Sequence, residues 1–271
     1  MRMADSMIID GERADRVPGD DRGLAYGDGV FRTLRVDHGN IQAWAVHIQR
    51  LAHDCARLSL PAPDTQRLRG ESEALFANGR SGVLKIMITR GSGGRGYTPP
   101  AGSVRRIVSA HPLPESVPGT LVLERSPVIL AEQPRLAGVK HLNRLEQVLA
   151  RQECEHAGVS DAFMCDSAGR IVSTTMRNLV FLQTDGEWVT PALARAGIIG
   201  ATRQRLMTAL GSAGTRVHER DVNLADLGRY CAAVACNSVS GPIPVERLGG
   251  QRFESSDSAR EYLQALMKDN D

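Results

Sequence analysis

Apolar residues in the first third of the chain follow both helical and extended periods. From Trp44 to Leu58 they recur at intervals of three and four, which gives a helix one apolar face. Residues 29–36 alternate between apolar and polar, and the Asp-His-Gly-Asn turn at 37–40 predicts a hairpin. The elements predicted for this part are strands at 6–9, 29–36, 83–89 and 104–110 and helices at 44–58 and 65–76.

A proline-rich segment separates this part from a second one, in which strands predominate. Residues 111–119, HPLPESVPG, contain three prolines and have the composition of a linker. The elements predicted beyond it are strands at 120–124, 162–166, 170–172, 179–182 and 188–190 and helices at 141–156, 201–210 and 256–267. We therefore predict a mixed α/β and α+β architecture, with a small N-terminal α/β domain at 1–113, a linker at 114–119 and a larger β-rich domain at 120–271.

Composition and charge narrow the class of protein. The chain is 42% hydrophobic and 24% charged with a formal net charge of +2, which gives no reason to expect nucleic acid or an acidic membrane surface as a partner. No stretch has the length or hydropathy of a signal peptide or a membrane span. The five cysteines form no CxxC pair and the histidines no metal-binding pattern, so we expect a cytoplasmic protein with reduced cysteines and no metal site.

Lysine is rare in this chain, and one lysine lies in a segment of distinctive sequence. Three of the 33 lysine and arginine residues are lysines: Lys85, Lys140 and Lys268. A primary amine can lose its proton and form a Schiff base, whereas a guanidinium cannot do so in any useful pH range. Lys140, in the segment GVKHLNRLE, is therefore a candidate for covalent chemistry. Taken alone, a solvated lysine before a helix is the simpler interpretation.

A Schiff-base lysine implies a carbonyl partner, and the commonest one bound by proteins is pyridoxal phosphate. The sequence offers three candidates for a phosphate site. Residues 197–203, GIIGATR, open a predicted helix whose free N–H groups favour an anion, with the Thr202 hydroxyl as a further donor. Arg50 and Ser238 are the other two. Each has a simpler interpretation by itself: a capped helix start, a surface arginine paired with Asp54 at i+4, and a turn residue.

Taken together, these segments resemble one family. YGDGVF at 26–31, HIQRL at 47–51, Lys140, the Asn-Leu pair at 178–179 and GATR at 200–203 occur in one order over most of the chain. This order resembles the fold-type IV pyridoxal phosphate enzymes, which include branched-chain and D-amino acid aminotransferases and the lyases of 4-amino-4-deoxychorismate. TRGSGGRGY at 89–97 and GVKHLNRLEQ at 138–147 are similar to the lyases. The aminotransferases often have a tyrosine five residues after the lysine, where this chain has Leu145.

The resemblance implies a fold, a cofactor and several residue roles. It implies a C-terminal pseudo-barrel domain, a cofactor at the domain junction and a homodimer. Lys140 would form the Schiff base with pyridoxal 5'-phosphate and later carry protons. Arg50, the backbone at Ala201 and Thr202, and the hydroxyls of Thr202 and Ser238 would hold the phosphate. The implied reaction, which belongs to folate biosynthesis, converts 4-amino-4-deoxychorismate to 4-aminobenzoate and pyruvate.

One position departs from the family pattern. The family usually has a glutamate five residues before the Asn of the Asn-Leu pair, where it faces the pyridine nitrogen. This chain has Ser173 there, and no acid from 171 to 183. A hydroxyl supplies no negative charge to stabilise a protonated ring. Transamination needs a long-lived delocalised carbanion, whereas elimination needs only a fleeting one, so Ser173 favours the lyase.

The substrate of such a lyase carries two carboxylates, for which arginines are suitable ligands. Arg95 in the glycine-rich loop is the first candidate, although it could also be a solvated loop residue. The further candidates are Arg90, Arg144, Tyr97, Asn143 and Arg32. Two other functions are compatible with the sequence: an aminotransferase of the same fold that acts on D- or branched-chain amino acids, and a diverged homologue without catalytic activity.

Overall fold

The computed structural model describes residues 6–99, 102 and 104–268 of the 271-residue chain. The chain forms two compact units. Unit 1 comprises Met1–Glu115 and Val139–Asn143, and unit 2 comprises Ser116–Gly138 and Arg144–Asp271. The segment Val139–Asn143 therefore groups with unit 1, whereas the sequence pattern assigned it to the C-terminal domain.

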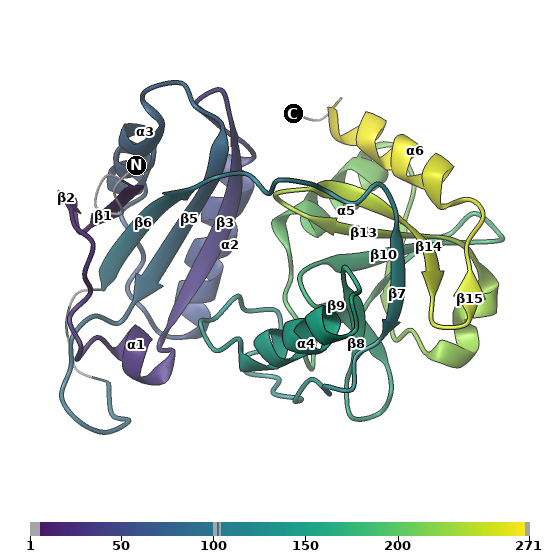
Figure 1. The fold of residues 1–271 in the computed structure, drawn as a ribbon, viewed down its shortest axis with the longest axis horizontal. Helices are drawn as coiled ribbons and strands as arrows, with labels where there is room; N and C mark the ends of the chain where they lie inside the picture. The colour runs from purple at the N-terminus through teal and green to yellow at the C-terminus, as the bar shows by residue number, and fades with distance from the viewer. Residues whose placement is uncertain (1–5, 100–101, 103, 269–271) are drawn as a thin grey trace. The chain divides into compact units, whose positions relative to one another are not determined.

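Unit 1 is built on an antiparallel sheet, whose described strands have the order β2-β1-β6-β5-β3-β4 (Figure 1). The strands are β1 (Met7–Ile9), β2 (Glu12–Arg13), β3 (Gly29–Asp37), β4 (Asn40–Ile41), β5 (Gly82–Thr89) and β6 (Arg105–His111). The helices are α1 (Arg22–Tyr26), α2 (Trp44–Arg57) and α3 (Thr65–Phe76). The hairpin, the strands β5 and β6 and both longer helices predicted from the sequence are confirmed.

One face of this sheet packs against α2 and α3 to form the core of unit 1. Leu34 of β3 and Leu84 of β5 are fully buried in one cluster with Leu51 of α2 and Leu68 of α3. Successive side chains of a strand point to opposite faces. The alternation in the sequence of β3 therefore decides which of its residues enter this core.

Unit 2 contains a larger sheet, whose described strands have the order β12-β11-β10-β13-β14-β7-β8-β9, with β15 paired to β14. The strands are β7 (Leu121–Arg125), β8 (Ala162–Cys165), β9 (Ile171–Thr174), β10 (Asn178–Gln183), β11 (Trp188–Pro191), β12 (Val217–Arg220), β13 (Tyr230–Asn237), β14 (Gly241–Leu248) and β15 (Gln251–Arg252). The helices are α4 (Leu145–His156), α5 (Ala201–Ser212), the 3-10 helix η2 (Leu224–Arg229) and α6 (Ser256–Lys268).

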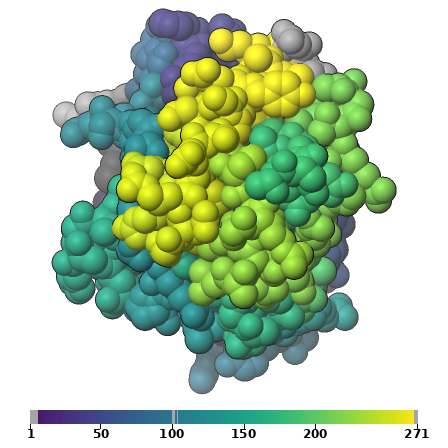
Figure 2. All heavy atoms as spheres, turned by 90° about the vertical axis from the view of Figure 1, so that its right-hand side faces the viewer, coloured from purple at the N-terminus to yellow at the C-terminus, as the bar shows by residue number. Residues whose placement is uncertain are grey.

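The central strands of unit 2 are buried on both faces. Phe181 of β10 packs in one cluster with Val245 of β14, while its neighbour Val180 packs with Leu206 of α5 and Leu263 of α6. Figure 2 shows the surface of this unit, where the C-terminal residues, in yellow, cover part of the face towards the viewer. Burial on both faces explains why these strands are continuously apolar in sequence rather than alternating.

One predicted helix starts later than expected, and several elements, among them α1, β12, β14 and β15, were not predicted. The helix predicted at 141–156 begins at Leu145, because the preceding residues pair with β3: Leu142 N–H donates to the Gly29 carbonyl at 2.9 Å. Strand β14 was not predicted, since it contains Pro242 and Pro244. These prolines lie before the point where β14 starts to pair with β7, so a missing N–H breaks no ladder bond on that side.

Candidate active site

Lys140 lies in a short segment of unit 1 that pairs with the start of β3. Its carbonyl oxygen accepts a hydrogen bond from the Phe31 N–H at 2.9 Å. Its own N–H donates to Asp54 Oδ2 at 2.9 Å. Hydrogen bonds therefore hold both the N–H and the carbonyl of Lys140. Its amine, Nζ, lies 4.3 Å from the centroid of the Phe31 ring.

Arg50 and Asp54 lie one turn apart on the buried side of α2. The predicted i+4 ion pair is present, with 3.4 Å between Arg50 Nη2 and Asp54 Oδ1. Arg50 is 9% exposed, so the surface position considered from the sequence is wrong. Asp54 is fully buried and also accepts a hydrogen bond from the Arg32 guanidinium. Burial lowers the pKa of Arg32 to about 10, which leaves it charged at neutral pH.

The start of α5 has the features of an anion site in unit 2. Gly200 is its N-cap residue and has no side chain with which to cap the first turn. The hydroxyls of Thr202 and Ser238 lie 3.2 Å apart. Asn178 holds this helix start, because its side chain donates to the Ile198 carbonyl at 2.8 Å and accepts from the Gly200 N–H at 3.0 Å. The structure thus brings the candidates Ala201, Thr202 and Ser238 together in unit 2, while Lys140 and Arg50 belong to unit 1.

Ser173 is a half-buried residue of β9, opposite Met164 of β8. The turn that follows it is fixed by Asp161, a fully buried carboxylate. Asp161 accepts hydrogen bonds from the hydroxyls of Thr174 and Thr175 at 2.8 and 2.6 Å and from Arg177 Nη1 at 2.6 Å. The network fixes the backbone between Ser173 and the Asn-Leu pair, and the role of Ser173 towards a cofactor stays a prediction.

The arginines predicted as substrate ligands have different surroundings. The Arg90 guanidinium donates to Asp28 Oδ2 at 2.8 Å and to the Leu58 carbonyl at 2.8 Å, so it ties its loop to the end of α2. Arg95 is exposed at the surface of the same loop. Burial lowers the pKa of Arg144 to about 10. None of these positions tests a substrate role, which stays a prediction for all three.

The loop that carries Arg95 and Tyr97 is held by Arg22, a residue that sequence reasoning did not find. Arg22 is 3% exposed, lies over the Tyr26 ring at 4.7 Å, and donates to the Gly96 carbonyl at 2.8 Å and the Tyr97 carbonyl at 3.2 Å. Tyr97 is 87% exposed. Asn143, another predicted ligand, donates to the Gly27 carbonyl at 3.2 Å.

The carboxylates Asp28 and Asp161 were also missing from the sequence-based site. Each binds an arginine, but Asp28 and Arg90 are 62 residues apart, so no local pattern indicates the pair. Asp161 contacts residues 13 to 16 positions further on, beyond the period of a helix or a strand.

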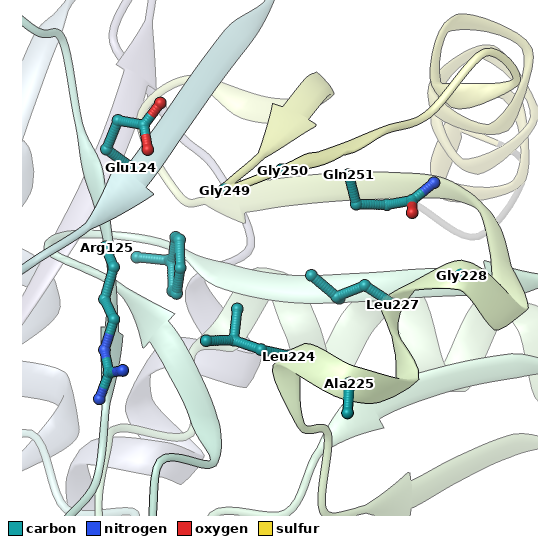
Figure 3. Close-up of a pocket in the computed structure, with 10 residues that line it drawn as sticks. Glu124, Arg125, Leu224, Ala225, Leu227, Gly228, Gly249, Gly250 and Gln251 are labelled. Carbon is teal, nitrogen blue, oxygen red and sulfur yellow. The ribbon is translucent and has the colours of Figure 1, made fainter.

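A separate cavity of about 460 Å³ lies in unit 2 (Figure 3). Its lining comes from the end of β7, Phe163, η2 and the turn between β14 and β15, and it includes none of the predicted site residues. Among the described residues, no group of histidine, cysteine, aspartate or glutamate side chains could hold a metal ion. No helix in the described ranges is long and apolar enough to cross a membrane.

The two units therefore offer complementary chemistry. Unit 1 holds a primary amine on a fixed main chain, with Arg50 on the adjacent helix. Unit 2 holds a helix start with free N–H groups and two hydroxyls, which suit a phosphate. Each of these groups is of a kind that a phosphorylated carbonyl cofactor needs.

Comparison with known proteins shows the family of the chain. The profile of the family described as amino-transferase class IV matches residues 29–248. The aminodeoxychorismate lyase of Vibrio harveyi is 34% identical over 243 residues, which cover 88% of this chain and 89% of that protein. A D-alanine aminotransferase of Listeria monocytogenes is 28% identical over 240 residues, 85% of this chain and 82% of that protein. The crystal structure of 4-amino-4-deoxychorismate lyase from Pseudomonas aeruginosa superposes with a TM-score of 0.90 at 39% identity, covering 97% of this chain and 98% of that one. The chain therefore belongs to the class IV aminotransferase family.

Proposed function

We propose that this protein is a pyridoxal 5'-phosphate-dependent lyase that converts 4-amino-4-deoxychorismate to 4-aminobenzoate and pyruvate. The observation that carries the proposal is Lys140, whose peptide is held at both its N–H and its carbonyl and whose amine lies against the Phe31 ring. A fixed amine suits a residue that bonds to a cofactor carbonyl and returns to it in every turnover.

The start of α5 fits the phosphate of this cofactor. Its N-cap residue, Gly200, has no side chain with which to cap the first turn, and the hydroxyls of Thr202 and Ser238 lie beside each other. We propose that Arg50, the backbone N–H groups of Ala201 and Thr202, and these two hydroxyls bind the phosphate. An arginine can direct two N–H bonds at phosphate oxygens, and hydroxyls and amides supply the remainder.

The chain's own residues can perform the proposed cleavage. When bound, pyridoxal phosphate withdraws electrons from the ring carbon that carries the substrate nitrogen, so the proton on that carbon becomes acidic. Lys140 Nζ removes this proton and holds it. The C–O bond to the enolpyruvyl group then breaks, and the remaining ring becomes aromatic. The departing oxygen gains a proton, and the enol so formed converts to its keto form, pyruvate. The two products contain all the atoms of the substrate, so no oxidant is required.

Two observations favour the lyase over an aminotransferase. The relatives from Vibrio harveyi and Pseudomonas aeruginosa, which have the higher identities reported above, are both named as lyases. Ser173 stands at the position that we expect to face the pyridine nitrogen, where it offers no negative charge. A less electron-poor cofactor suits elimination, because expulsion of the enolpyruvyl oxygen ends the carbanion's lifetime quickly.

The substrate carboxylates need cationic or polar ligands. We propose Arg95 as the first, because it is an exposed cation on a loop that Arg22 holds in place. Arg90, Arg144, Tyr97 and Asn143 are further candidates.

We further propose that the protein works as a homodimer in the cytoplasm. The dimer follows from the family resemblance. The location is supported by the five cysteines, all of which are free thiols in the structure.

Cofactor trapping and a product assay test the function. Purified protein should be yellow, borohydride should attach the cofactor to Lys140, and aminodeoxychorismate should yield 4-aminobenzoate and pyruvate in equal amounts. Lys140→Ala should abolish trapping and turnover. Lys85→Ala is the matched control, because Lys85 Nζ lies 5.4 Å from the same Phe31 ring, and it should still trap cofactor at Lys140.

Two outcomes would overturn the proposal in different ways. A colourless protein that borohydride does not label would exclude the cofactor. A labelled protein that exchanges amines with keto acids but forms no 4-aminobenzoate would be an aminotransferase.

A further inference from the structure

Asp54 is an unusual residue for the interior of unit 1. It is fully buried on α2, next to the core residues Leu51 and Cys55. A buried carboxylate is costly unless it is paired and hydrogen-bonded. Its partners come from three separate parts of unit 1: Arg32 on β3, Arg50 on α2, and the main chain at Lys140.

Arg32 occupies a core position of the sheet. Val30, Leu34 and Val36 lie on the face of β3 that packs against α2, and Arg32 falls in the same alternating set. Its side chain is 1% exposed and donates to Asp54 and to the Arg50 carbonyl, the latter at 3.1 Å. A guanidinium in this register needs a carboxylate opposite it, and Asp54 provides one.

The same carboxylate reaches two residues of the proposed cofactor site. Asp54 Oδ2 accepts the Lys140 N–H at 2.9 Å, and Asp54 Oδ1 lies 3.4 Å from Arg50 Nη2. The opposite side of Lys140 is fixed by the bond from Phe31 N–H to its carbonyl. Removing the Asp54 carboxylate would therefore leave the Lys140 N–H without this acceptor and would remove one contact of the Arg50 guanidinium.

We propose that Asp54 is a positioning residue, which fixes the main chain at Lys140 and the guanidinium of Arg50, and which together with Arg32 sets the charge around the Lys140 amine. This rests on the proposed function, since it concerns the amine that binds the cofactor. Asp54 has one negative charge and Arg32 and Arg50 have two positive charges, so the three groups carry one net positive charge.

Two further titratable groups of unit 1 lie near the residues of this network. Lys85 on β5 approaches the same Phe31 ring, and His53 on α2 lies 3.3 Å from Asp54 Oδ1. Both are present in every variant described below. Neither substitution changes the contact of Lys85 with the Phe31 ring, so its contribution stays the same throughout. His53 loses its charged neighbour in Asp54→Asn but keeps it in Arg32→Met, so the Arg32→Met shift is free of this effect.

The test is the pH midpoint of the visible absorbance of the cofactor-loaded protein, which reports protonation of the Lys140 nitrogen. Asp54→Asn removes a negative charge, disfavours the protonated form and should lower the midpoint by about half a pH unit, since charges ~10 Å apart still interact in a protein. Arg32→Met removes a positive charge and should raise it by a similar amount. The double variant restores the net charge and should return the midpoint close to that of the wild type.

Opposite shifts cannot come from destabilisation alone, because both single variants destabilise unit 1. Glu71→Gln is the matched control. It breaks the part-buried ion pair between Glu71 Oε1 and Arg106 Nη2, which lie 2.9 Å apart. This pair belongs to α3 and β6 and includes neither Lys140 nor Arg50. The substitution should lower thermal stability and leave the midpoint unchanged. If Asp54→Asn does not fold, Arg32→Met decides the question by itself, since Asp54 keeps Arg50 and the Lys140 N–H.

The proposal is overturned if the midpoint does not move in Arg32→Met, or if it moves in the same direction in both single variants. If the wild type is yellow and is labelled by borohydride, either of these results in the variants leaves the proposed function intact. Absence of colour and labelling in the wild type would instead contradict the proposed function.

Discussion

Ser173 is the residue from which we argue the choice between elimination and transamination. It lies half-buried in β9, and the Asp161 network fixes the turn behind it. A carboxylate at this position would hold a proton on the ring nitrogen through its opposite charge, and a hydroxyl cannot. The chemistry of one side chain is therefore expected to set how long the carbanion lives.

Ser173→Glu should increase the rate of amine exchange with keto acids by about ten-fold or more, equivalent to about 1.4 kcal/mol of transition-state stabilisation. Lyase turnover should change less. Single-turnover formation of the pyridoxamine form of the cofactor measures the effect. Ser173→Ala is the control, because it removes the hydroxyl without adding charge. An unchanged exchange rate in Ser173→Glu would show that the ring nitrogen does not depend on this position.

Helix α5 shows how an element can present a site that none of its residues makes individually. Its start is positioned by Asn178, which lies at the beginning of β10 and contacts both Ile198 and Gly200. A Cβ at Gly200 would lie 2.3 Å from Asn178 Oδ1, so only glycine permits this close approach. We expect the strand, through one side chain, to set the direction of the N–H groups that receive the phosphate.

Asn178→Ala should weaken binding of pyridoxal phosphate by about ten-fold, because two hydrogen bonds at a mostly buried site are lost. Binding of pyridoxal, which lacks the phosphate, should change much less. Titration of both compounds by absorbance gives the two affinities. Asn223→Ala removes an exposed contact with Asp226 and should affect neither. Equal weakening for both compounds would mean that Asn178 supports the fold and not the phosphate site.

The element scale is also where sequence-based prediction succeeded most. The periods of α2 and α3 and the alternation of β3 identified these elements to within a few residues. The start of α4 was misplaced because His141 and Leu142, which were included in the predicted helix, pair with β3 instead. Such pairing joins segments more than 100 residues apart, and no local period encodes it.

At the scale of the whole molecule, the residues that we propose as cofactor ligands belong to different units: Lys140 and Arg50 to unit 1, and the α5 start and Ser238 to unit 2. A ligand that binds the folded state stabilises the residues that hold it, by about 2.7 kcal/mol at a free concentration 100 times its Kd.

Cofactor binding should therefore slow amide hydrogen exchange in two places, residues 139–143 of unit 1 and residues 198–203 of unit 2. Exchange followed by mass spectrometry with and without pyridoxal phosphate measures this. The Lys140→Ala variant should lose most of the protection in the first segment. Protection confined to one unit would contradict a cofactor shared by both.

The sequence by itself determined most of the helices and strands, the rarity and setting of Lys140, and the order of motifs that places the chain in its family. These depend on local periods and on residue types, which a chain carries without being folded. Only the tertiary structure decided that Arg50 is buried, that Arg32 enters the core opposite Asp54, and that residues 139–143 pack with unit 1. These depend on pairing between distant segments, where a buried charge must find its partner, and that partner is fixed by the fold.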